Sequence, residues 1–266
     1  RFVFSAQDAN TGFAKQDTGG IYRTVNLQTQ PPVWTNIWVP STPTMRGIAI
    51  SPADANFLYV ILKDKSIYKT VNALAAVPVF TAMTPAPLPV SATNSSGGFA
   101  VLKNGIVYMF SDGYVFRSAD EGATWTPVGS GSVTTTLNTQ APIISLITDT
   151  THENLESLYA LTMRGVYYKD NTMTDWIYFE DNNLPSIARY TDMDIFYDAS
   201  NLNNSLLRVS TYGRGTWESP LANNVMVNQL PLVSITAPFD GQGFNTGSNI
   251  ALQANATDPD GFITKV

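Results

Sequence analysis

Two carboxylates stand two residues apart at Asp192 and Asp194, on either side of Met193 in an apolar stretch. Side chains two residues apart in a β-strand point to the same face of a sheet. Hydrolysis of a glycosidic bond uses two carboxylates about 5 to 9.5 Å apart across a groove, one of them with a raised pKa. Asp192 and Asp194 are therefore the candidate catalytic residues, with Asp149 as a third candidate, and the same side chains equally suit the wall of a water-filled channel.

Arginine side chains suggest a second chemistry, the recognition of a ligand carboxylate. A sialidase would need three convergent arginines and a tyrosine nucleophile. The chain has eight arginines, and Arg23, Arg117 and Arg214 occupy positions within the repeated segments, which favours a structural role. Arg46 lies outside those positions and is the candidate ligand-binding arginine.

Metal chemistry has two candidate centres. His152 is the single histidine and lies in a polar loop, where an imidazole without a second histidine is usually solvated. Asp258 and Asp260, just before Gly261, have a spacing seen in calcium loops, but the same residues also form ordinary turns. We expect no cofactor, with calcium at Asp258 and Asp260 as the alternative.

The overall composition excludes several classes of function. The chain of 266 residues has 15 Lys and Arg, 21 Asp and Glu, and a net charge of −6, which argues against a nucleic-acid partner. No window of about 18 apolar residues exists, so membrane insertion is not expected. The absence of cysteine excludes a disulfide scaffold, a thiolate zinc site and a cysteine nucleophile.

A repeat organises most of the chain. Five segments share a β-branched or small residue, then an aromatic residue, then a charged residue, and their aromatic residues are 46 to 52 residues apart. A spacing of this size is typical of propeller blades, in which four short strands occupy roughly 40 to 50 residues. The aromatic residues are Tyr22, Tyr68, Phe116, Tyr168 and Trp217.

The rest of each period has the pattern of short strands. Upstream of the aromatic residue, an apolar run of four to six residues leads through a polar loop to a second apolar run, as in residues 47–50 and 57–62. No segment shows sustained helical periodicity. The sequence therefore predicts an all-β fold, namely a β-propeller with at least four four-stranded blades. The repeat accounts for four full periods and a partial first blade.

One turn of the repeat carries a recognisable motif. Residues 118–125 match the pattern S/T-x-D-x-G-x-T/S-W, known as the Asp-box and found in BNR-type propellers. In this motif the aspartate accepts backbone hydrogen bonds, the glycine allows a left-handed conformation, and the tryptophan packs the hairpin onto its blade. We expect a structural role for Ser118, Asp120, Gly122, Thr124 and Trp125.

A longer sequence pattern in the chain resembles that of a particular group of Asp-box propellers. The residues Ile50-Ser51-Pro52, with Asp54 and Asn56, followed by 58–60 and 67–70, are similar to the sortilin-type and xyloglucanase-type group. Residues 207–218 are similar to the last blade of large secreted propeller proteins from the Bacteroidetes. The resemblance covers roughly residues 1–220 and implies secretion, often by the type IX route, but the group includes hydrolases, receptors and adhesins.

The repeat stops after Pro220. We expect a linker over 221–229 and the first strands of a bacterial Ig-like or cadherin-like sandwich over 230–266, because apolar residues alternate in 230–238 and 249–258. About 36 residues cannot complete a sandwich of about 100. We therefore expect the propeller (1–220) and this segment to be joined to further domains in a longer protein, with the propeller incomplete at its N-terminal side.

Two functions follow as alternatives. The first is an extracellular or cell-surface binding or scaffold module, adhesin-like, with a glycan or protein ligand. The second is a secreted glycoside hydrolase of the xyloglucanase type. Only one of the Asp-box turns is intact and no convincing pair of catalytic acids is evident, which favours the binding module over the enzyme.

Overall fold

The computed structural model describes residues 1–17, 19–41, 44–89, 95–129, 142–179, 184–185, 189–222 and 232–257. The chain divides into two compact units, residues 1–220 and residues 221–266, and each is described by itself. Asp258 and Asp260, the candidate calcium ligands, lie outside the described residues. No helix among the described residues has the length and apolar character needed to cross a membrane.

The first unit consists of five antiparallel sheets, which we number as blades 1 to 5 in chain order. Each strand pairs with the next strand of the chain, so every blade is a simple meander. Two 3₁₀ turns, η1 (Glu153–Leu155) and η2 (Leu202–Asn204), lie in the loops of blades 4 and 5. The strands are β1 (Phe2–Phe4), β2 (Gly12–Gln16), β3 (Gly20–Thr24) and β4 (Thr35–Trp38) in blade 1; β5 (Met45–Ile50), β6 (Leu58–Leu62), β7 (Ile67–Thr70) and β8 (Thr81–Ala82) in blade 2; β9 (Gly97–Val101), β10 (Val107–Ser111), β11 (Tyr114–Ser118) and β12 (Thr126–Pro127) in blade 3; β13 (Ile143–Thr148), β14 (Leu158–Thr162), β15 (Gly165–Lys169) and β16 (Ile177–Tyr178) in blade 4; and β17 (Tyr190–Phe196), β18 (Leu206–Thr211) and β19 (Gly215–Pro220) in blade 5.

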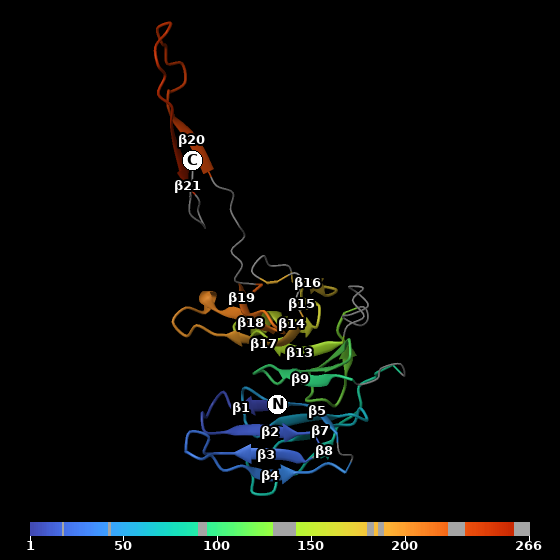
Figure 1. Ribbon diagram of the computed structural model, residues 1–266. Helices are drawn as coiled ribbons and strands as arrows, with labels where there is room; N and C mark the ends of the chain where they lie inside the picture. Colours follow the sequence, from blue (N-terminus) through green and yellow to red (C-terminus); the bar gives the residue numbers. More distant parts are fainter. Residues whose placement is uncertain are drawn as a thin grey trace. The chain divides into compact units, whose positions relative to one another are not determined.

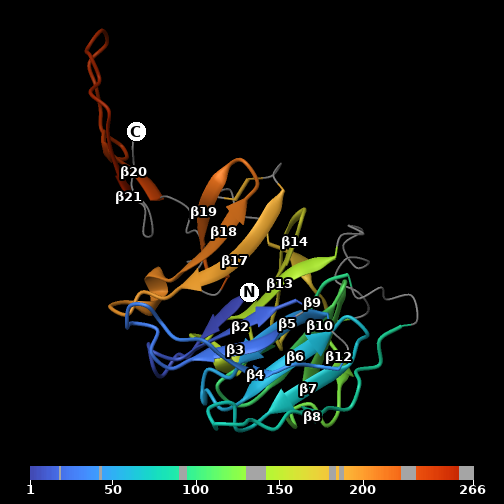
Figure 2. The ribbon, with the colours of Figure 1, turned by 60° about the horizontal axis from the view of Figure 1, so that its bottom comes forward.

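These sheets form a five-bladed propeller arrangement, which confirms the predicted all-β fold. The innermost strands contact one another in chain order, β1 with β5, β5 with β9, β9 with β13 and β13 with β17. Figures 1 and 2 show the sheets following one another in colour order from blue to orange. The expectation of a partial first blade is wrong, because blade 1 has four strands; β1 is only three residues long, too short for its pattern to be recognised.

The burial of the strands distinguishes the middle blades from the end blades. In blades 2, 3 and 4 the second strands, β6, β10 and β14, are buried at every position because a neighbouring blade covers each face. In blade 5, β18 has fully buried side chains only at alternate positions, and β17 exposes Asp192, Asp194 and Phe196. Blades 1 and 5 therefore each have one covered face and one exposed face.

The charged residue of the repeat connects one blade to the next. Arg23 of blade 1 donates through Nη1 to the carbonyl oxygens of Ala73 and Ala75 in blade 2, at 2.8 and 2.6 Å. Lys69 of blade 2 donates to the Glu121 carbonyl oxygen in blade 3 at 3.1 Å and to the Glu121 carboxylate at 3.0 Å. The repeat thus places a cation where the turn of the following blade offers backbone carbonyl groups.

Blades 3 and 4 are connected differently. Arg117 binds the Glu156 carboxylate of blade 4 through two hydrogen bonds, of 2.6 and 2.8 Å, and Glu156 also accepts one from the Tyr108 hydroxyl. Lys169, at the repeat position of blade 4, turns back and donates to the carbonyl oxygens of Asp170 and Met173 in its own blade. In blade 5 the charged position of the repeat is occupied by Glu218, which pairs with Arg208 of the same sheet.

The intact Asp-box turn is held together by Asp120. Its carboxylate accepts hydrogen bonds from the Thr124 amide at 2.9 Å, the Thr124 hydroxyl at 2.6 Å and the Ser118 hydroxyl at 2.7 Å. Gly122 has φ +87°, a conformation that residues with a Cβ rarely adopt. The Trp125 indole nitrogen donates to the Thr84 carbonyl oxygen at 2.9 Å, which anchors the hairpin to the connection between blades 2 and 3.

The hydrogen bonds to Asp120 predict an unusually low pKa for its carboxyl group. The Thr124 hydrogen bonds, followed by that of Ser118, lower the pKa of the Asp120 carboxyl to about 2. Because the folded pKa is depressed, the stabilisation from this turn is complete above about pH 4 and is lost as the pH falls through about 2. Carboxyl carbon chemical shifts measured by NMR should give a midpoint near pH 2 for Asp120, and Thr124→Ala should raise it. Thr126→Ala is the control, because that hydroxyl donates to the Arg117 carbonyl oxygen instead; equal effects of both substitutions would contradict the assignment.

The second unit contains one described pair of strands. β20 (Leu232–Ala237) and β21 (Gln253–Thr257) pair antiparallel, with a register shift between Ile235 and Ala237. Both strands lie within the segments in which the alternation of apolar residues predicted strands. The third strand expected over 262–266 lies outside the described residues.

Candidate functional site

A cavity of about 880 Å³ lies where the innermost strands of the five blades converge. Its wall is predominantly apolar and takes side chains from every blade, among them Phe4, Ile48, Phe99, Leu146 and Ile195. Volumes of this size are typical of ligand sites, which are concave, mostly apolar and supplied with a few polar groups. The cavity is therefore the candidate binding site.

The innermost strands of blades 2 and 3 pack closely against each other. A Cβ atom added to Gly47 of β5 would lie 2.5 Å from the Gly97 carbonyl oxygen and 2.6 Å from the Gly98 Cα atom of β9. Contacts this short are not tolerated, so glycine is required for the two backbones to approach. The sequence fixes the spacing of these two inner strands through these glycines.

One mouth of the cavity is formed by the turns that follow the innermost strands. Ala6, Ala53 and Thr150 line it from blades 1, 2 and 4, and Lys103 and Tyr197 line it from blades 3 and 5. Ala6 and Ala53 are exposed. Small side chains at these two positions leave the mouth open.

Asp194 lies on the cavity wall, and Asp192 does not line the cavity. Both carboxylates are exposed on the same side of β17, as the sequence indicates, and each accepts a hydrogen bond from the next backbone amide at 2.9 Å. Among the described residues that line the cavity, Asp194 is the one carboxylate, and the other charged residues are Arg1 and Lys103. The described part of the cavity wall thus has no second acid across from Asp194.

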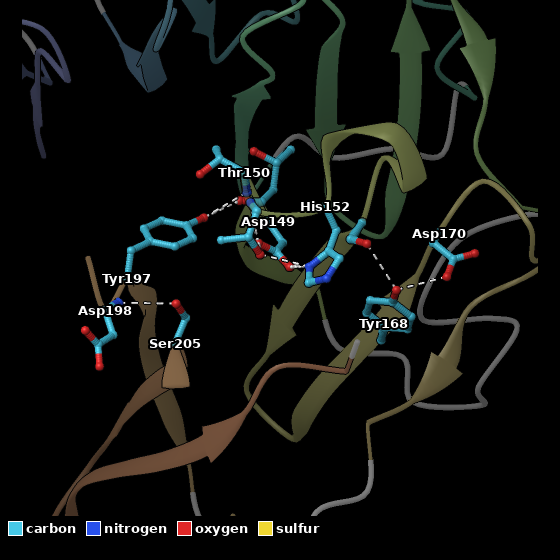
Figure 3. A network of polar contacts seen from close by, with 11 residues as sticks. Asp149, Thr150, His152, Tyr168, Asp170, Tyr197, Asp198 and Ser205 are labelled. Carbon is cyan, nitrogen blue, oxygen red and sulfur yellow. Dashed lines mark hydrogen bonds and ion pairs between the residues drawn. The ribbon is translucent and has the colours of Figure 1, made fainter. Parts of the chain in front are cut away.

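Asp149, the third carboxylate candidate, is fully buried in a network that joins blades 4 and 5 (Figure 3). It accepts hydrogen bonds from the Thr151 amide at 2.8 Å and the Thr151 hydroxyl at 2.6 Å, and its other oxygen lies 2.8 Å from His152 Nδ1. Tyr197 of blade 5 accepts from the Thr150 amide at 2.9 Å. The network aligns the loop of blade 4 with the end of β17.

The position of Asp149 is a turn cap that recurs in blades 1, 2 and 5. Ser5 Oγ accepts from the Gln7 amide in blade 1, Ser51 Oγ from the Ala53 amide in blade 2, and Asp198 from the Ser200 amide in blade 5, each two residues further along the chain. A residue of this type bonded two residues ahead stabilises a turn. Asp149 and its neighbour His152 therefore shape the mouth of the cavity, and among the described residues no group of three or more acidic, histidine or cysteine side chains could hold a metal ion.

The candidate arginines do not converge. Arg23 and Arg117 are engaged between different blades, and Arg214 lies in the hairpin of blade 5, where its carbonyl oxygen accepts from the Trp217 indole at 3.0 Å. Arg46 is half-buried at the bulge near the start of β5, does not line the cavity, and interacts electrostatically with Asp17. The structure brings none of the four to the cavity wall.

Comparisons with known proteins agree with this architecture. Residues 231–266 match the model of the bacterial Ig domain, and no curated protein matches the chain. The chain is similar to the structure of YCF48 bound to D1 peptide, with 12% identity and a TM-score of 0.54 over 83% of this chain and 67% of that chain. It is similar to an ancestral GH74 enzyme, with 15% identity and a TM-score of 0.52 over 97% of this chain and 38% of that chain. It is also similar to an auxiliary nutrient binding protein from Bacteroides thetaiotaomicron, with 11% identity and a TM-score of 0.53 over 82% of this chain and 56% of that chain.

The fold is a β-propeller, followed by a segment that matches a bacterial Ig domain. At these sequence identities the similarity establishes the fold alone. The matched structures include both binding proteins and an enzyme, so the chemistry must be argued from the cavity itself.

Proposed function

We propose that the chain is a non-catalytic binding module of an extracellular bacterial protein, with the central cavity as its ligand site. The observation that supports this most is the composition of the cavity wall, which is mostly apolar and, among the residues that the structure describes, has one carboxylate, Asp194. General acid and base hydrolysis of a glycoside needs two carboxyl groups. An apolar wall with few polar groups is instead suited to holding a ligand without reaction.

The similar structures support a binding role and an extracellular location. They include a nutrient binding protein from Bacteroides thetaiotaomicron and YCF48 bound to D1 peptide. The match of residues 231–266 to a bacterial Ig domain agrees with a location outside the cell, on a larger surface protein. A glycan or a protein segment is the ligand class that we propose, with adhesion or ligand capture as the role.

A second candidate function is hydrolysis of a polysaccharide. It is favoured by the similarity to an ancestral GH74 enzyme and by the position of Asp194 on the cavity wall. This chain spans 38% of that enzyme. A second carboxylate would have to be supplied from outside the described part of the wall.

The two functions are separated by a panel of polysaccharides, including xyloglucan, and a peptide array. We expect the chain to release no reducing ends and to be retained on one glycan or peptide. The variants Asp192→Asn and Asp194→Asn should likewise release no reducing ends. Asp194→Asn should alter retention on the ligand more than Asp192→Asn does, because Asp194 lines the cavity and Asp192 does not. Release that either substitution abolishes would establish the hydrolase, and absence of both release and retention would contradict the binding module.

A further inference from the structure

The innermost strand of every blade brings one unpaired edge to the cavity. The strands β1, β5, β9, β13 and β17 each stand at the end of their sheet, so one edge of each has no partner strand within that sheet. Such an edge carries backbone N–H and C=O groups at every second residue, and these groups can pair with another extended chain. The inner edges therefore add backbone polar groups to a wall whose side chains are mostly apolar.

The turns beyond these strands show which residues face the inner edge. In blade 2 the Ser51 amide donates to the Phe57 carbonyl oxygen at 2.9 Å and so continues the ladder of β5 and β6. Hydrogen-bonded pairs alternate along an antiparallel ladder, so Ile48 and Ile50 direct their backbone groups to the other edge. In blade 1 the Ser5 amide makes the equivalent bond to the Thr11 carbonyl oxygen at 3.0 Å, which places Phe2 and Phe4 at the inner edge of β1.

The amides at the inner edge have no partner in the protein. Phe2, Phe4, Ile48 and Ile50 all line the cavity, and among the residues that the structure describes their amides donate to no acceptor. Backbone N–H groups away from bulk water are paired in nearly all protein structures. These amides therefore need water or a ligand as their acceptor.

The edge of β17 is blocked by its own side chains. The Asp192 carboxylate accepts a hydrogen bond from the Met193 amide and the Asp194 carboxylate accepts one from the Ile195 amide, both at 2.9 Å. Charged side chains on an edge strand are one means by which proteins prevent pairing with another chain. The two carboxylates that suggested catalysis thus close this edge of the cavity.

The edge of β1 is the accessible one. The side chains of Phe2 and Phe4 are 60% and 54% exposed. The corresponding residues of β5, β9 and β13, which are Ile48, Phe99 and Leu146, are at most 3% exposed. An incoming chain can therefore reach the unpaired backbone of β1, whereas neighbouring strands cover the edges of the middle blades.

The polar groups of the wall suit a peptide better than a sugar. The Tyr197 hydroxyl is already engaged, because it accepts from the Thr150 amide at 2.9 Å and donates to the Thr148 carbonyl oxygen at 3.3 Å. A sugar in the cavity would bring several hydroxyl groups, and each one left without a partner costs free energy. The backbone groups of β1 instead repeat about every 6.8 Å, which is the repeat of two residues in an extended peptide.

We propose that the cavity binds an extended protein segment whose backbone pairs with the inner edge of β1. This inference rests on the proposed function of the cavity as a ligand site and assigns its ligand to protein rather than glycan. The segment has apolar side chains at alternate residues, which pack on the apolar wall, and no proline at the residues that pair. Because β1 offers its edge at Phe2 and Phe4 alone, the contact is short and we expect micromolar dissociation constants.

Fluorescence anisotropy with the full chain tests this proposal. The probes are capped hexapeptides with Val, Ile, Leu or Phe at the odd positions and Thr at the even positions, and xyloglucan oligosaccharides form the second arm. We expect at least one peptide to bind. Methylation of the backbone nitrogens of one alternate set of its residues should weaken binding at least 10-fold, because those amides face β1. Methylation of the other set should change binding less than 2-fold.

A pair of variants locates the edge. Phe4→Pro removes the unpaired amide, and proline is tolerated on edge strands where the N–H has no partner. Phe4→Ala is the matched control, because it also removes the ring but keeps the amide. Phe4→Pro should bind the same peptide at least 10-fold more weakly than Phe4→Ala, and thermal unfolding of each variant shows whether the fold is retained.

The outcomes separate this inference from the proposed function. Equal effects of the two methylated sets, or equal affinities of Phe4→Pro and Phe4→Ala, would overturn pairing with β1. Binding of a xyloglucan oligosaccharide without binding of any peptide would overturn the inference and leave the binding module intact. Absence of binding in both arms, together with absence of retention on the polysaccharide panel and the peptide array, would overturn both.

Discussion

Arg117→Met should lower the free energy of unfolding by roughly 2 to 3 kcal/mol, a large effect for one surface-facing arginine. Arg117 holds the Glu156 carboxylate of the next blade in a two-pronged pair, and only 15% of the Glu156 side chain is exposed. Without the guanidinium group the carboxylate stays buried and loses its charged partner. The cost is the desolvation of an unpaired charge as well as the loss of two hydrogen bonds.

Arg208→Met is the matched control. Arg208 and Glu218 form a similar pair at 2.7 Å, but both side chains are exposed and belong to one sheet. Exposed pairs contribute little, so this substitution should change the free energy of unfolding by about 0.5 kcal/mol or less. Urea unfolding measures both changes, and the double variant Arg117→Met with Glu156→Gln should recover part of the loss. Equal losses for the two single variants would contradict the role assigned to Arg117.

The effect of Arg117 should also depend on pH. The Arg117 hydrogen bonds lower the pKa of the Glu156 carboxyl below its ordinary value. A depressed folded pKa contributes stability above the unfolded pKa of about 4.3, and this contribution is lost as the pH falls through the folded value. The difference in stability between the natural chain and Arg117→Met should therefore be constant near neutral pH and shrink below about pH 4.

The sequence predicted the repeat position of Arg117 but not its partner. The repeat shows that an arginine or lysine follows the aromatic residue in four blades. Arg23 reaches only carbonyl groups of the next turn, and Lys69 reaches both a carbonyl group and the carboxylate of Glu121. Arg117 reaches a carboxylate, and Lys169 turns back to its own blade. Such choices depend on the loop of the neighbouring blade, which no spacing within one repeat encodes.

The difference between middle and end blades is visible in the sequence once the strands are aligned. The second strand of blade 2, residues 58–62, is entirely apolar or aromatic, whereas that of blade 5, residues 206–211, alternates with Arg208 and Ser210. Continuous apolar strands are covered on both faces, and alternating strands on one. The pattern therefore predicts that one face of blade 5 meets solvent, as the structure shows.

The cavity was less predictable. Asp194 was a candidate because of its type and spacing, but Lys103, Tyr197 and the apolar wall depend on how five sheets converge. The available signal is the alignment of residues at the ends of the innermost strands, which places Tyr197 with Phe4, Ile50 and Thr148. The same alignment assigns Asp149 to the turn position of Ser5 and Ser51, which favours a structural role for it.

Ala53→Trp should weaken ligand binding at the cavity at least 10-fold. Ala53 is exposed and lines the mouth, so an indole at this position occupies the entrance without displacing buried residues. A 10-fold loss of affinity corresponds to about 1.4 kcal/mol of binding free energy. The free energy of unfolding should stay nearly unchanged, because the turn is held by the Ser51 hydroxyl and the Ala53 backbone amide, which the substitution retains.

The matched control for this obstruction is Val77→Trp. Val77 is 81% exposed in the turn between β7 and β8 and does not line the cavity, so the same side chain added there should leave binding unchanged. Isothermal titration with the glycan or peptide retained by the chain measures both affinities. Unchanged affinity in Ala53→Trp would place the ligand outside the cavity, whereas loss in Ala53→Trp alone would locate it there, because the two variants differ only in whether the indole stands at the mouth.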